Sequence, residues 1–326
     1  LTGTDPRWGI VTGIRPVKMT GDLMRKLQDS EKVRKVLENY YRISREKTDL
    51  VMDIHSYQQE IFDDSPEDRV GIYIGIPFCP SRCYYCSFTS NQAEKEEVRR
   101  YMNALYEEID FVAKLIKTKR WGVESIYIGG GTPTVLEGSV LKEFLYRVRK
   151  RFLGKETEEF TLEAGRADTI TEEKLSVAGD AGVNRISINP QTMNERTLGR
   201  IGRRHSAGQV VQAFEIARDV GFHAINADVI AGLPGEDRED FERTLDRVLQ
   251  LEPENITVHS LAVKRGSDLA VEDEEYHYRQ GRNVTQMLDV SRKVLKREGY
   301  RPYYLYRQKH MSGSQENIGY CREGTA

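Results

Sequence analysis

Apolar and polar positions along the middle of the chain follow two alternating patterns, one typical of short buried strands and one typical of amphipathic helices. The strand pattern, rich in β-branched residues and bounded by turn residues, occurs six times. A run with helical periodicity follows each occurrence. The expected strands are 71–76, 124–128, 159–163, 185–189, 224–230 and 255–261, and the expected helices are 94–118, 140–152, 171–179, 208–220, 238–251 and 283–297.

This alternation predicts an α/β fold, because helices that separate successive strands place those strands parallel in one sheet. Six repeats are too few for the closed eight-stranded barrel. We therefore expect an open (β/α)6 partial TIM barrel, whose open side suits a large flat substrate. The aromatic run YRPYYLY at 300–306 predicts a further strand at the sheet edge, where Pro302 is tolerated.

Changes in pattern outside the repeats predict four segments. Residues 1–55 form a small N-terminal helical segment, with helical periodicity over 16–28 and 31–46. Residues 56–69 are expected to be a linker, because the run DDSPED contains a turn signal and no core residue. The partial barrel is expected to span residues 70–299. Residues 300–326 hold the edge strand and the start of a C-terminal region that we expect to be incomplete.

Charge and cysteine content narrow the function classes. The 49 lysines and arginines nearly balance the 51 aspartates and glutamates, so nothing indicates a nucleic-acid partner. No apolar run approaches the roughly 18 residues of a membrane span, and no signal peptide is visible. Three of the four cysteines are clustered, which fits a reducing compartment better than a secreted disulfide scaffold. We expect a cytoplasmic protein with no membrane span.

The cysteines in the loop after the first predicted strand are the strongest chemical signal. Pro77 ends that strand, and Cys79, Cys83 and Cys86 follow with the spacing C-x3-C-x2-C. Thiolates select zinc or iron–sulfur clusters. A disulfide would leave one of the three thiols unpaired, and a structural zinc site needs four ligands. Inert buried cysteines are a further alternative. We favour a [4Fe–4S] cluster with three protein ligands and one open iron.

The cysteine loop also carries a family resemblance. CPSRCYYC, with Tyr85 before the last cysteine, matches the signature C-x3-C-x-aromatic-C of the radical S-adenosylmethionine (SAM) superfamily. IYIGIPFCPSRCYYCSF, IYIGGGTPT and NADVIAGLPGE are similar to the branch that contains oxygen-independent coproporphyrinogen III oxidases. The opening WGIVTGIRPVK and the closing YYLYRQKHMSGSQENIGY resemble its clostridial and bacillar subgroup, the coproporphyrinogen dehydrogenases. The resemblance covers nearly the whole chain.

The resemblance implies a radical SAM oxidoreductase of porphyrin and haem biosynthesis. The cluster on Cys79, Cys83 and Cys86 would bind SAM at its open iron and cleave it reductively to methionine and a 5′-deoxyadenosyl radical. The reaction implied is the oxygen-independent decarboxylation of two propionates of coproporphyrinogen III to vinyl groups, which gives protoporphyrinogen IX. The partners implied are the tetrapyrrole substrate and an external one-electron donor of the flavodoxin or ferredoxin type.

The resemblance also assigns residues to SAM, and most of them follow or end predicted strands, where parallel sheets place ligands. The glycine run at 129–131 does not match G-x-G-x-x-G, which argues against a dinucleotide site. Arg203 is assigned to the SAM carboxylate, although Arg204 is adjacent, and Glu163 could instead cap a turn. The SAM-contacting residues implied are Tyr85, Gly130, Gly131, Thr132, Glu163, Gln191, Arg203, Asp228 and Gly232.

Residues that would meet the substrate are less sharply defined. Tyr73 matches a catalytic tyrosine that the oxidases place near their substrate, and a core tyrosine on the first strand is the alternative. A tetracarboxylate substrate would need cations at the same rim, near His259. The basic residues available are Arg82, Arg166, Lys264, Arg265, Arg301 and Arg307, which the sequence does not rank.

Two departures from the oxidases keep other functions open. Gly75 stands where those oxidases carry a histidine, and Ser87 stands where they have a further cysteine. One alternative is a radical SAM enzyme that acts on haem or another tetrapyrrole, by methyl transfer or haem degradation. Another is a non-enzymatic haem chaperone, whose signature has a histidine where this chain has Glu316 beside Asn317. A ferredoxin-like electron carrier would leave the polar strand-end residues unexplained.

Overall fold

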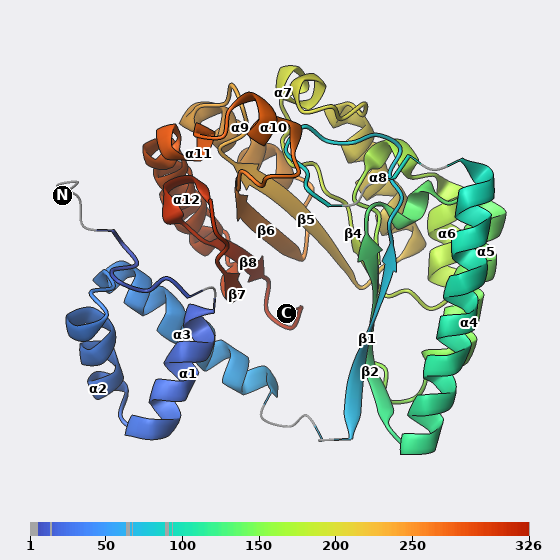
Figure 1. The fold of residues 1–326 in the computed structure, drawn as a ribbon, viewed down its shortest axis with the longest axis horizontal. Coiled ribbons are helices and arrows are strands. Elements are labelled where there is room, and N and C mark those ends of the chain that lie inside the picture. The colour runs from blue at the N-terminus through green and yellow to red at the C-terminus, as the bar shows by residue number, and fades with distance from the viewer. Residues whose placement is uncertain are drawn as a thin grey trace. The chain divides into compact units, whose positions relative to one another are not determined.

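The computed structural model describes residues 6–13, 15–62, 66, 68–88, 91–92 and 94–325, with the side chain of Phe62 left out. The chain divides into two compact units. One unit consists of Leu1–Asp64, Val229–Leu245 and Asn255–Ala326, and the other consists of Ser65–Asp228 and Asp246–Glu254. We call them the first unit and the second unit. Figure 1 labels their helices and strands.

The second unit is built on parallel strands. Successive strands pair in the order β1-β2-β3-β4-β5, with Ile74 opposite Ile128 and Ile128 opposite Leu162. These isoleucine and leucine side chains are buried, as expected for a parallel sheet covered by helices. The strands are β1 (Arg69–Ile76), β2 (Gly122–Gly130), β3 (Glu159–Glu163), β4 (Arg185–Ser187) and β5 (Ala224–Ala231).

Helices follow the strands of the second unit, and three of them begin at residues whose side chains cap the helix. Ser206 and Gln209 form a reciprocal capping box, and Thr171 and Asn194 also cap helices with their side chains. Each such cap contributes about 1 kcal/mol. Helices α4, α5 and α6 lie side by side (Figure 1). The helices are α4 (Lys95–Lys119), α5 (Gly138–Phe152), α6 (Glu172–Asp180), α7 (Glu195–Arg200) and α8 (Ala207–Val220), with 3-10 turns at Pro133–Val135 and Ala167–Thr169.

The first unit contains the end of β5, from Val229 on, and three further strands. The strand order there is β5-β6-β8-β7, and both β6 and β7 pair with β8 in antiparallel fashion. Helix α3 packs against α1 and β7. The elements are α1 (Pro16–Leu27), α2 (Ser30–Lys35), α3 (Arg45–Phe62), α9 (Arg238–Leu249, of which residues 246–249 belong to the second unit), β6 (Asn255–Ser260), α10 (Asp268–Glu272), α11 (Tyr276–Arg279), α12 (Gly281–Arg297), β7 (Arg301–Tyr306) and β8 (Asn317–Cys321), with a 3-10 turn at Ser312–Ser314.

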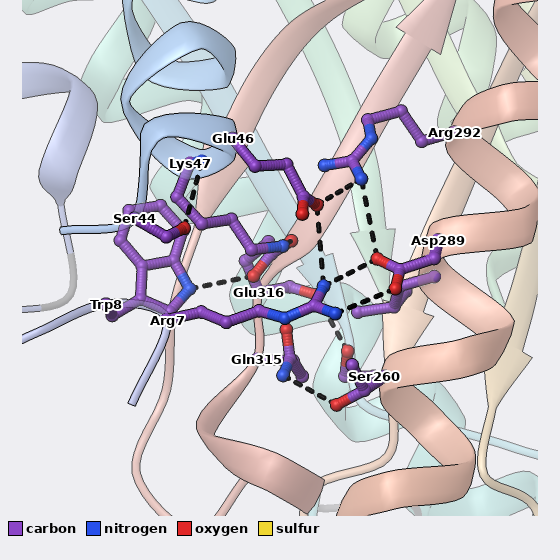
Figure 2. A network of polar contacts seen from close by, with 12 residues as sticks. Arg7, Trp8, Ser44, Glu46, Lys47, Ser260, Asp289, Arg292, Gln315 and Glu316 are labelled. Carbon is purple, nitrogen blue, oxygen red and sulfur yellow. Dashed lines mark hydrogen bonds and ion pairs between the residues drawn. The ribbon is translucent and has the colours of Figure 1, made fainter. Parts of the chain in front are cut away.

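A buried polar network ties the N-terminal helices of the first unit to its C-terminal strand. Lys47 on α3 forms an ion pair with Glu316, and both side chains are 1% exposed. The Trp8 Nε1–H donates to the same carboxylate across 2.8 Å. Figure 2 shows both side chains pointing toward Glu316. The network joins residues that lie far apart in the sequence.

The sequence prediction of the fold is confirmed in class and corrected in detail. All six predicted strands are present, and the edge strand with Pro302 is β7. The predicted helix 31–46 is wrong, because α2 ends at Lys35, a π-helical turn spans Val36–Tyr40, and α3 begins at Arg45. The predicted linker is wrong over 56–62, which belongs to α3, while most of DDSPED lies outside the described residues. Strand β8 was not predicted.

Among the described helices, none is long and apolar enough to cross a membrane.

Candidate cofactor site

The cysteine loop follows β1 in the second unit and is held in place by backbone hydrogen bonds. The N–H of Cys79 donates to Asn91 O across 3.2 Å. The N–H of Tyr84 donates to Ile201 O across 3.1 Å. The N–H of Cys86 donates to Cys83 O across 2.9 Å, which closes a turn between two of the thiols. The loop is therefore fixed to two separate parts of the second unit.

The three thiols of the loop lie in partly or fully desolvated positions. Cys83 is buried, and Cys79 and Cys86 are partly exposed. Burial raises the pKa of Cys79, and the nearby Cys83 and Cys86 act in the same direction. Burial also raises the pKa of Cys86. Because a thiolate is the metal ligand, bound metal would compensate the cost of deprotonating these groups.

The spacing of the thiols is not that of a single-ion site. No three histidine, cysteine, aspartate or glutamate side chains among the described residues gather closely enough to hold one metal ion. A four-iron cluster is larger than one ion and separates its thiolate ligands accordingly. The fourth cysteine, Cys321, is buried in the first unit, where its thiol contacts the Tyr57 hydroxyl at 3.6 Å.

The glycine turn after β2 lies directly against the cysteine loop. The N–H of Gly131 donates to Ile76 O across 2.8 Å, and the N–H of Thr132 donates to Phe78 O across 2.7 Å. A Cβ atom on Gly131 would lie 2.5 Å from Phe78 O and 3.0 Å from the Cys79 Sγ. Only glycine fits there. Gly130 has a φ of +110°, which also favours glycine.

The carboxylate of Glu163 lies at the end of β3, as predicted, and is already hydrogen-bonded. The Gly130 N–H donates to its Oε2 across 3.0 Å, and the Tyr127 hydroxyl donates to its Oε1. Burial and the Glu163 charge raise the pKa of Tyr127, so its hydroxyl remains a donor. The sequence analysis did not predict a role for Tyr127, although the alternation of IYIGGG places it on the same strand as Gly130.

Tyr73 on β1 is not a core residue. Its side chain is 65% exposed, so the alternative interpretation as a core tyrosine is wrong. Its ring stacks on the ring of Tyr127, with centroids 5.8 Å apart. Burial of part of the ring and the charge of Glu163 raise the pKa of Tyr73. The exposed ring lies beside the Glu163 carboxylate group that the resemblance assigns to SAM.

Gln191, in the loop after β4, lies beside Asp228 within β5. The Gln191 N–H donates to Asp228 O across 2.9 Å, and Gln191 adopts a φ of +66°. A non-glycine residue at positive φ is strained, and such strain concentrates at functional sites. The Asp228 Oδ1 accepts a hydrogen bond from Asn226 across 2.8 Å, so this strand carboxylate is partnered. The buried Oε1 of Gln191 has no hydrogen-bond partner in the described structure.

The structure distinguishes Arg203 from its neighbour Arg204. Arg203 is buried and donates through Nη1 to Gly165 O at 2.9 Å and Asn189 O at 2.6 Å, whereas Arg204 is exposed. The buried Nε of Arg203 has no hydrogen-bond partner among the described residues. Burial raises the pKa of Tyr85, while the Arg203 charge opposes that shift, so the two side chains are close.

The donor and acceptor set of this region fits SAM. An unpartnered buried acceptor on Gln191 and an unpartnered buried donor on Arg203 are each costly in free energy. A ligand with amino, carboxylate and ribose groups can satisfy both atoms. The crowded glycine turn presents its backbone beside the thiols at the same place. These observations support a cofactor site at the predicted strand ends of the second unit.

Arg166 lies behind the cysteine loop and was not predicted to act there. Its Nη1 donates to Ser81 Oγ across 2.9 Å and contacts the Cys83 Sγ at 3.8 Å. Two hydrogen bonds of 2.9 and 2.8 Å join its guanidinium to Asp168, which is 3.6 Å from the buried His205 Nδ1. Arg166 is 2% exposed, so the structure removes it from the residues available to substrate carboxylates.

Gly232 lies in the first unit, and its assigned contact with SAM stays a prediction. It has a φ of +92°, and a Cβ atom there would lie 2.5 Å from a methyl carbon of Val284. Its carbonyl accepts a hydrogen bond from the Tyr276 hydroxyl across 3.1 Å. Glycine is therefore required at this position for packing alone.

A cavity of about 520 Å³ adjoins the cysteine loop at Cys79, between α4 and the segment around Leu136. Apart from that cysteine, none of the residues assigned to the cluster or to SAM is in its described lining. The cavity therefore does not mark the cofactor site.

Comparison with known proteins identifies relatives of the chain. Residues 73–248 match the model of the Radical SAM superfamily. The chain is 38% identical over 329 residues to the oxygen-independent coproporphyrinogen-III oxidase-like protein HemZ of Bacillus subtilis (strain 168), covering 99% of this chain and 66% of that protein. It is 37% identical over 193 residues to the heme chaperone HemW of the same organism, covering 59% of this chain and 50% of HemW.

A solved structure shares the fold. Coproporphyrinogen III oxidase (HemN) from Escherichia coli, a radical SAM enzyme, superposes with a TM-score of 0.67 at 24% identity, covering 83% of this chain and 59% of that chain. The likeness shows the fold of the partial barrel. The chain spans just under two thirds of HemZ and half of HemW.

Proposed function

The chain belongs to the radical SAM superfamily, and from this premise we propose that it catalyses oxygen-independent decarboxylation of coproporphyrinogen III. Each of two propionates would lose a β-hydrogen atom to the 5′-deoxyadenosyl radical, and then lose carbon dioxide and pass one electron to an external one-electron acceptor, which leaves a vinyl group. The superfamily brings a [4Fe–4S] cluster and SAM as cofactors. The observation that carries the proposal is the 38% identity over 99% of this chain with a protein named as coproporphyrinogen-III oxidase-like.

We assign the cluster to Cys79, Cys83 and Cys86. When bound, the cluster supplies the electron that cleaves SAM into methionine and a 5′-deoxyadenosyl radical. The loop fixes the thiols, and Arg166 behind them offers a positive charge and a hydrogen-bond donor. The cysteine spacing, the mutual effect of the thiols on their pKa values and the close approach of Gly131 all support this assignment.

We assign SAM to the polar groups at the strand ends. The backbone of Gly130, Gly131 and Thr132 would meet its amino group. The unpartnered Nε of Arg203 and Oε1 of Gln191 would meet its other polar groups. With Glu163, Tyr85 and Asp228, these residues orient SAM and exclude water around it. Gly232 would contribute to its adenine pocket. The ring of Tyr73, which is exposed, would contact a flat substrate.

A haem chaperone is the second candidate, favoured by the similarity to HemW. The position of Glu316 argues against it. The chaperone signature has a histidine there. In this chain Glu316 is 0% exposed, and its two carboxylate oxygens accept hydrogen bonds from Lys47 and Trp8. A side chain held in that way serves the packing of the first unit. The HemW similarity also covers only 59% of this chain, against 99% for HemZ.

Gly75 is one of the two departures from the oxidases that keep a haem-directed radical enzyme open as an alternative. The oxidases carry a histidine there, and this chain has room for a Cβ atom at this position, because the nearest atom to it would be 3.6 Å away on Tyr73. The glycine is therefore not imposed by packing. We propose that the chain delivers protons or electrons by another route while the substrate class is the same.

The product of the reaction tests the proposal. Reconstituted, reduced protein is incubated under argon with SAM and either coproporphyrinogen III or haem, and the tetrapyrrole is analysed by mass spectrometry. We expect coproporphyrinogen III to lose two carboxyl groups and haem to be unchanged. Intact coproporphyrinogen III beside haem-dependent SAM cleavage would replace this proposal with a haem-modifying enzyme. Haem binding without SAM cleavage would replace it with a chaperone.

A further inference from the structure

The first unit contains a basic pocket that the cofactor site does not use. The pocket has a volume of about 460 Å³ and lies between the N-terminal segment, α11 and the loop after β7. No aspartate or glutamate is among its described lining residues. Its polar and aromatic lining includes Trp8, His277, Arg307, Lys309, His310 and Gln315.

Arg307 lines this pocket and forms no ion pair with a carboxylate among the described residues. Its Nη1 donates to Val11 O across 2.7 Å and its Nη2 to Ser314 O across 3.1 Å. Its guanidinium lies 4.9 Å from the Trp8 ring centroid, and its buried Nε has no partner in the described structure. Burial lowers the pKa of Arg307, although the Glu316 charge opposes this shift. A half-buried cation without a carboxylate partner is costly.

The neighbouring charges are already paired. Arg7 forms hydrogen bonds of 2.6 and 2.9 Å with Asp289, and Figure 2 shows its guanidinium facing that carboxylate and Glu46. Glu316, whose charge reaches Arg307, is paired with Lys47. The charge of Arg7 is therefore balanced by Asp289 and Glu46, and the charge of Glu316 is balanced by Lys47.

The rim of the pocket adds a second cation on a shaped loop. Lys309 is exposed and has no ion-pair partner among the described residues. The loop around it contains two non-glycine residues at positive φ, His310 at +59° and Ser314 at +51°. Such strain persists only where surrounding contacts impose it. Here the His310 carbonyl accepts a hydrogen bond from the Val263 N–H across 3.0 Å.

We propose that this pocket binds carboxylate groups of a ligand, with Arg307 as its buried anchor and Lys309 at its rim. A guanidinium with a free Nε–H and a nearby ammonium match a carboxylate in charge and in hydrogen-bonding geometry. Identification of these carboxylates with tetrapyrrole propionates rests on the proposed function. On this proposal, Arg307 is a stronger candidate to bind substrate carboxylates than the other basic residues of the chain, because it lines the pocket.

Porphyrin binding tests the pocket without turnover. The reconstituted protein is titrated under argon with coproporphyrin III, which carries four carboxylates, and with its uncharged tetramethyl ester, and binding is followed by fluorescence anisotropy. Arg307→Gln and Lys309→Ala are compared with the exposed control variants Arg42→Gln and Lys26→Ala of the same unit. Inorganic phosphate serves as the competing anion. Arg307→Lys keeps the charge and loses the planar fork.

We expect coproporphyrin III to bind more tightly than its ester, and Arg307→Gln and Lys309→Ala each to weaken it on the order of tenfold, as loss of a charge-assisted contact implies. Both control variants should bind like the parent, and Arg307→Lys should be intermediate. Lys309 is exposed and forms no ion pair among the described residues, so we expect its substitution to spare the fold. Equal binding of acid and ester, unchanged binding in both pocket variants, or displacement by phosphate at matching concentrations would overturn the proposal.

Failure of this inference is distinguishable from failure of the proposed function. If Arg307 and Lys309 variants bind porphyrin normally while coproporphyrinogen III is decarboxylated, the pocket assignment is wrong and the function stands. If porphyrin binding depends on both residues while no decarboxylation occurs, the pocket stands and the reaction is wrong.

Discussion

The Arg166 guanidinium lies 3.8 Å from the Cys83 Sγ and is fixed there by two hydrogen bonds to Asp168. Hydrogen bonds and positive charge near thiolate ligands stabilise the reduced form of an iron–sulfur cluster. Because Arg166 is buried and spans the cysteine loop and the segment after β3, it connects the fold of the second unit to the chemistry of the cluster.

Substitution of this pair should therefore move the reduction potential in opposite directions. Arg166→Gln removes the charge and should lower the potential by about 60 mV, the change that a tenfold shift in a one-electron equilibrium produces. Asp168→Asn removes the neutralising carboxylate and should raise it. Redox titration followed by electron paramagnetic resonance measures both, with iron content as the control. Equal potentials in parent and variants would show that Arg166 has a packing role only.

Two glycines near the cofactor site should respond differently to the same substitution. In Gly131→Ala the new Cβ would lie 2.5 Å from the Phe78 carbonyl, so the glycine turn and the cysteine loop must separate. In Gly75→Ala the nearest atom is 3.6 Å away. We expect SAM affinity, measured by equilibrium dialysis, to fall at least about tenfold in the first variant, equivalent to about 1.4 kcal/mol, and to stay unchanged in the second. The reverse order would contradict the described turn.

The ion pair between Lys47 and Glu316 should matter for stability rather than for the cofactor. Glu316→Gln leaves Lys47 buried and unpaired, and should lower the free energy of unfolding by about 3–5 kcal/mol. The double variant Lys47→Met, Glu316→Gln removes both charges while the glutamine can still accept from Trp8, so it should recover most of the loss. Urea unfolding followed by circular dichroism measures this. A single-variant cost below about 1 kcal/mol, typical of exposed pairs, would contradict the buried geometry.

The buried His205 predicts a dependence of stability on pH. Burial lowers the pKa of His205 below its usual 6.5, and Asp168 only partly opposes the shift. The unfolded state therefore takes up the proton first as pH falls, so His205 costs no stability above the unfolded pKa and destabilises the protein increasingly below it. His205→Gln should reduce the loss of unfolding free energy between pH 7.5 and 5.5, relative to the parent. The slope removed is at most about 1.4 kcal/mol per pH unit. An identical slope in both proteins would refute the assignment.

The parts of the molecule that sequence reasoning could reach are those with local signals. Strand and helix periodicity predicted six of the eight strands of the sheet, and the cysteine spacing predicted the loop after β1. The helix prediction failed near Val36–Tyr40, where a π-helical turn with the i→i+5 hydrogen bond from the Tyr41 N–H to Val36 O replaces the α-helix. The continuation of α3 to Phe62 was missed because its polar end resembles a linker.

Interactions between distant residues were beyond sequence reasoning. Arg166 and Cys83 are 83 residues apart, and Trp8 and Glu316 are 308 residues apart. Neither pair has a periodic or motif signal. Strand β8 carries apolar residues on a buried antiparallel strand whose partners, β6 and β7, are set by tertiary pairing. The basic pocket depends in the same way on the meeting of the N-terminal segment with the loop after β7.

The ratio of carbon dioxide to 5′-deoxyadenosine tests the central claim most directly. Reduced, reconstituted protein is supplied with SAM and coproporphyrinogen III, and both products are quantified in the parent and in a variant with Cys79, Cys83 and Cys86 all changed to alanine. If the radical removes one hydrogen for each propionate lost, the parent should form the two products in equal amounts and the variant should form neither. Formation of 5′-deoxyadenosine by the parent without carbon dioxide, or of either product by the cysteine variant, would contradict the account.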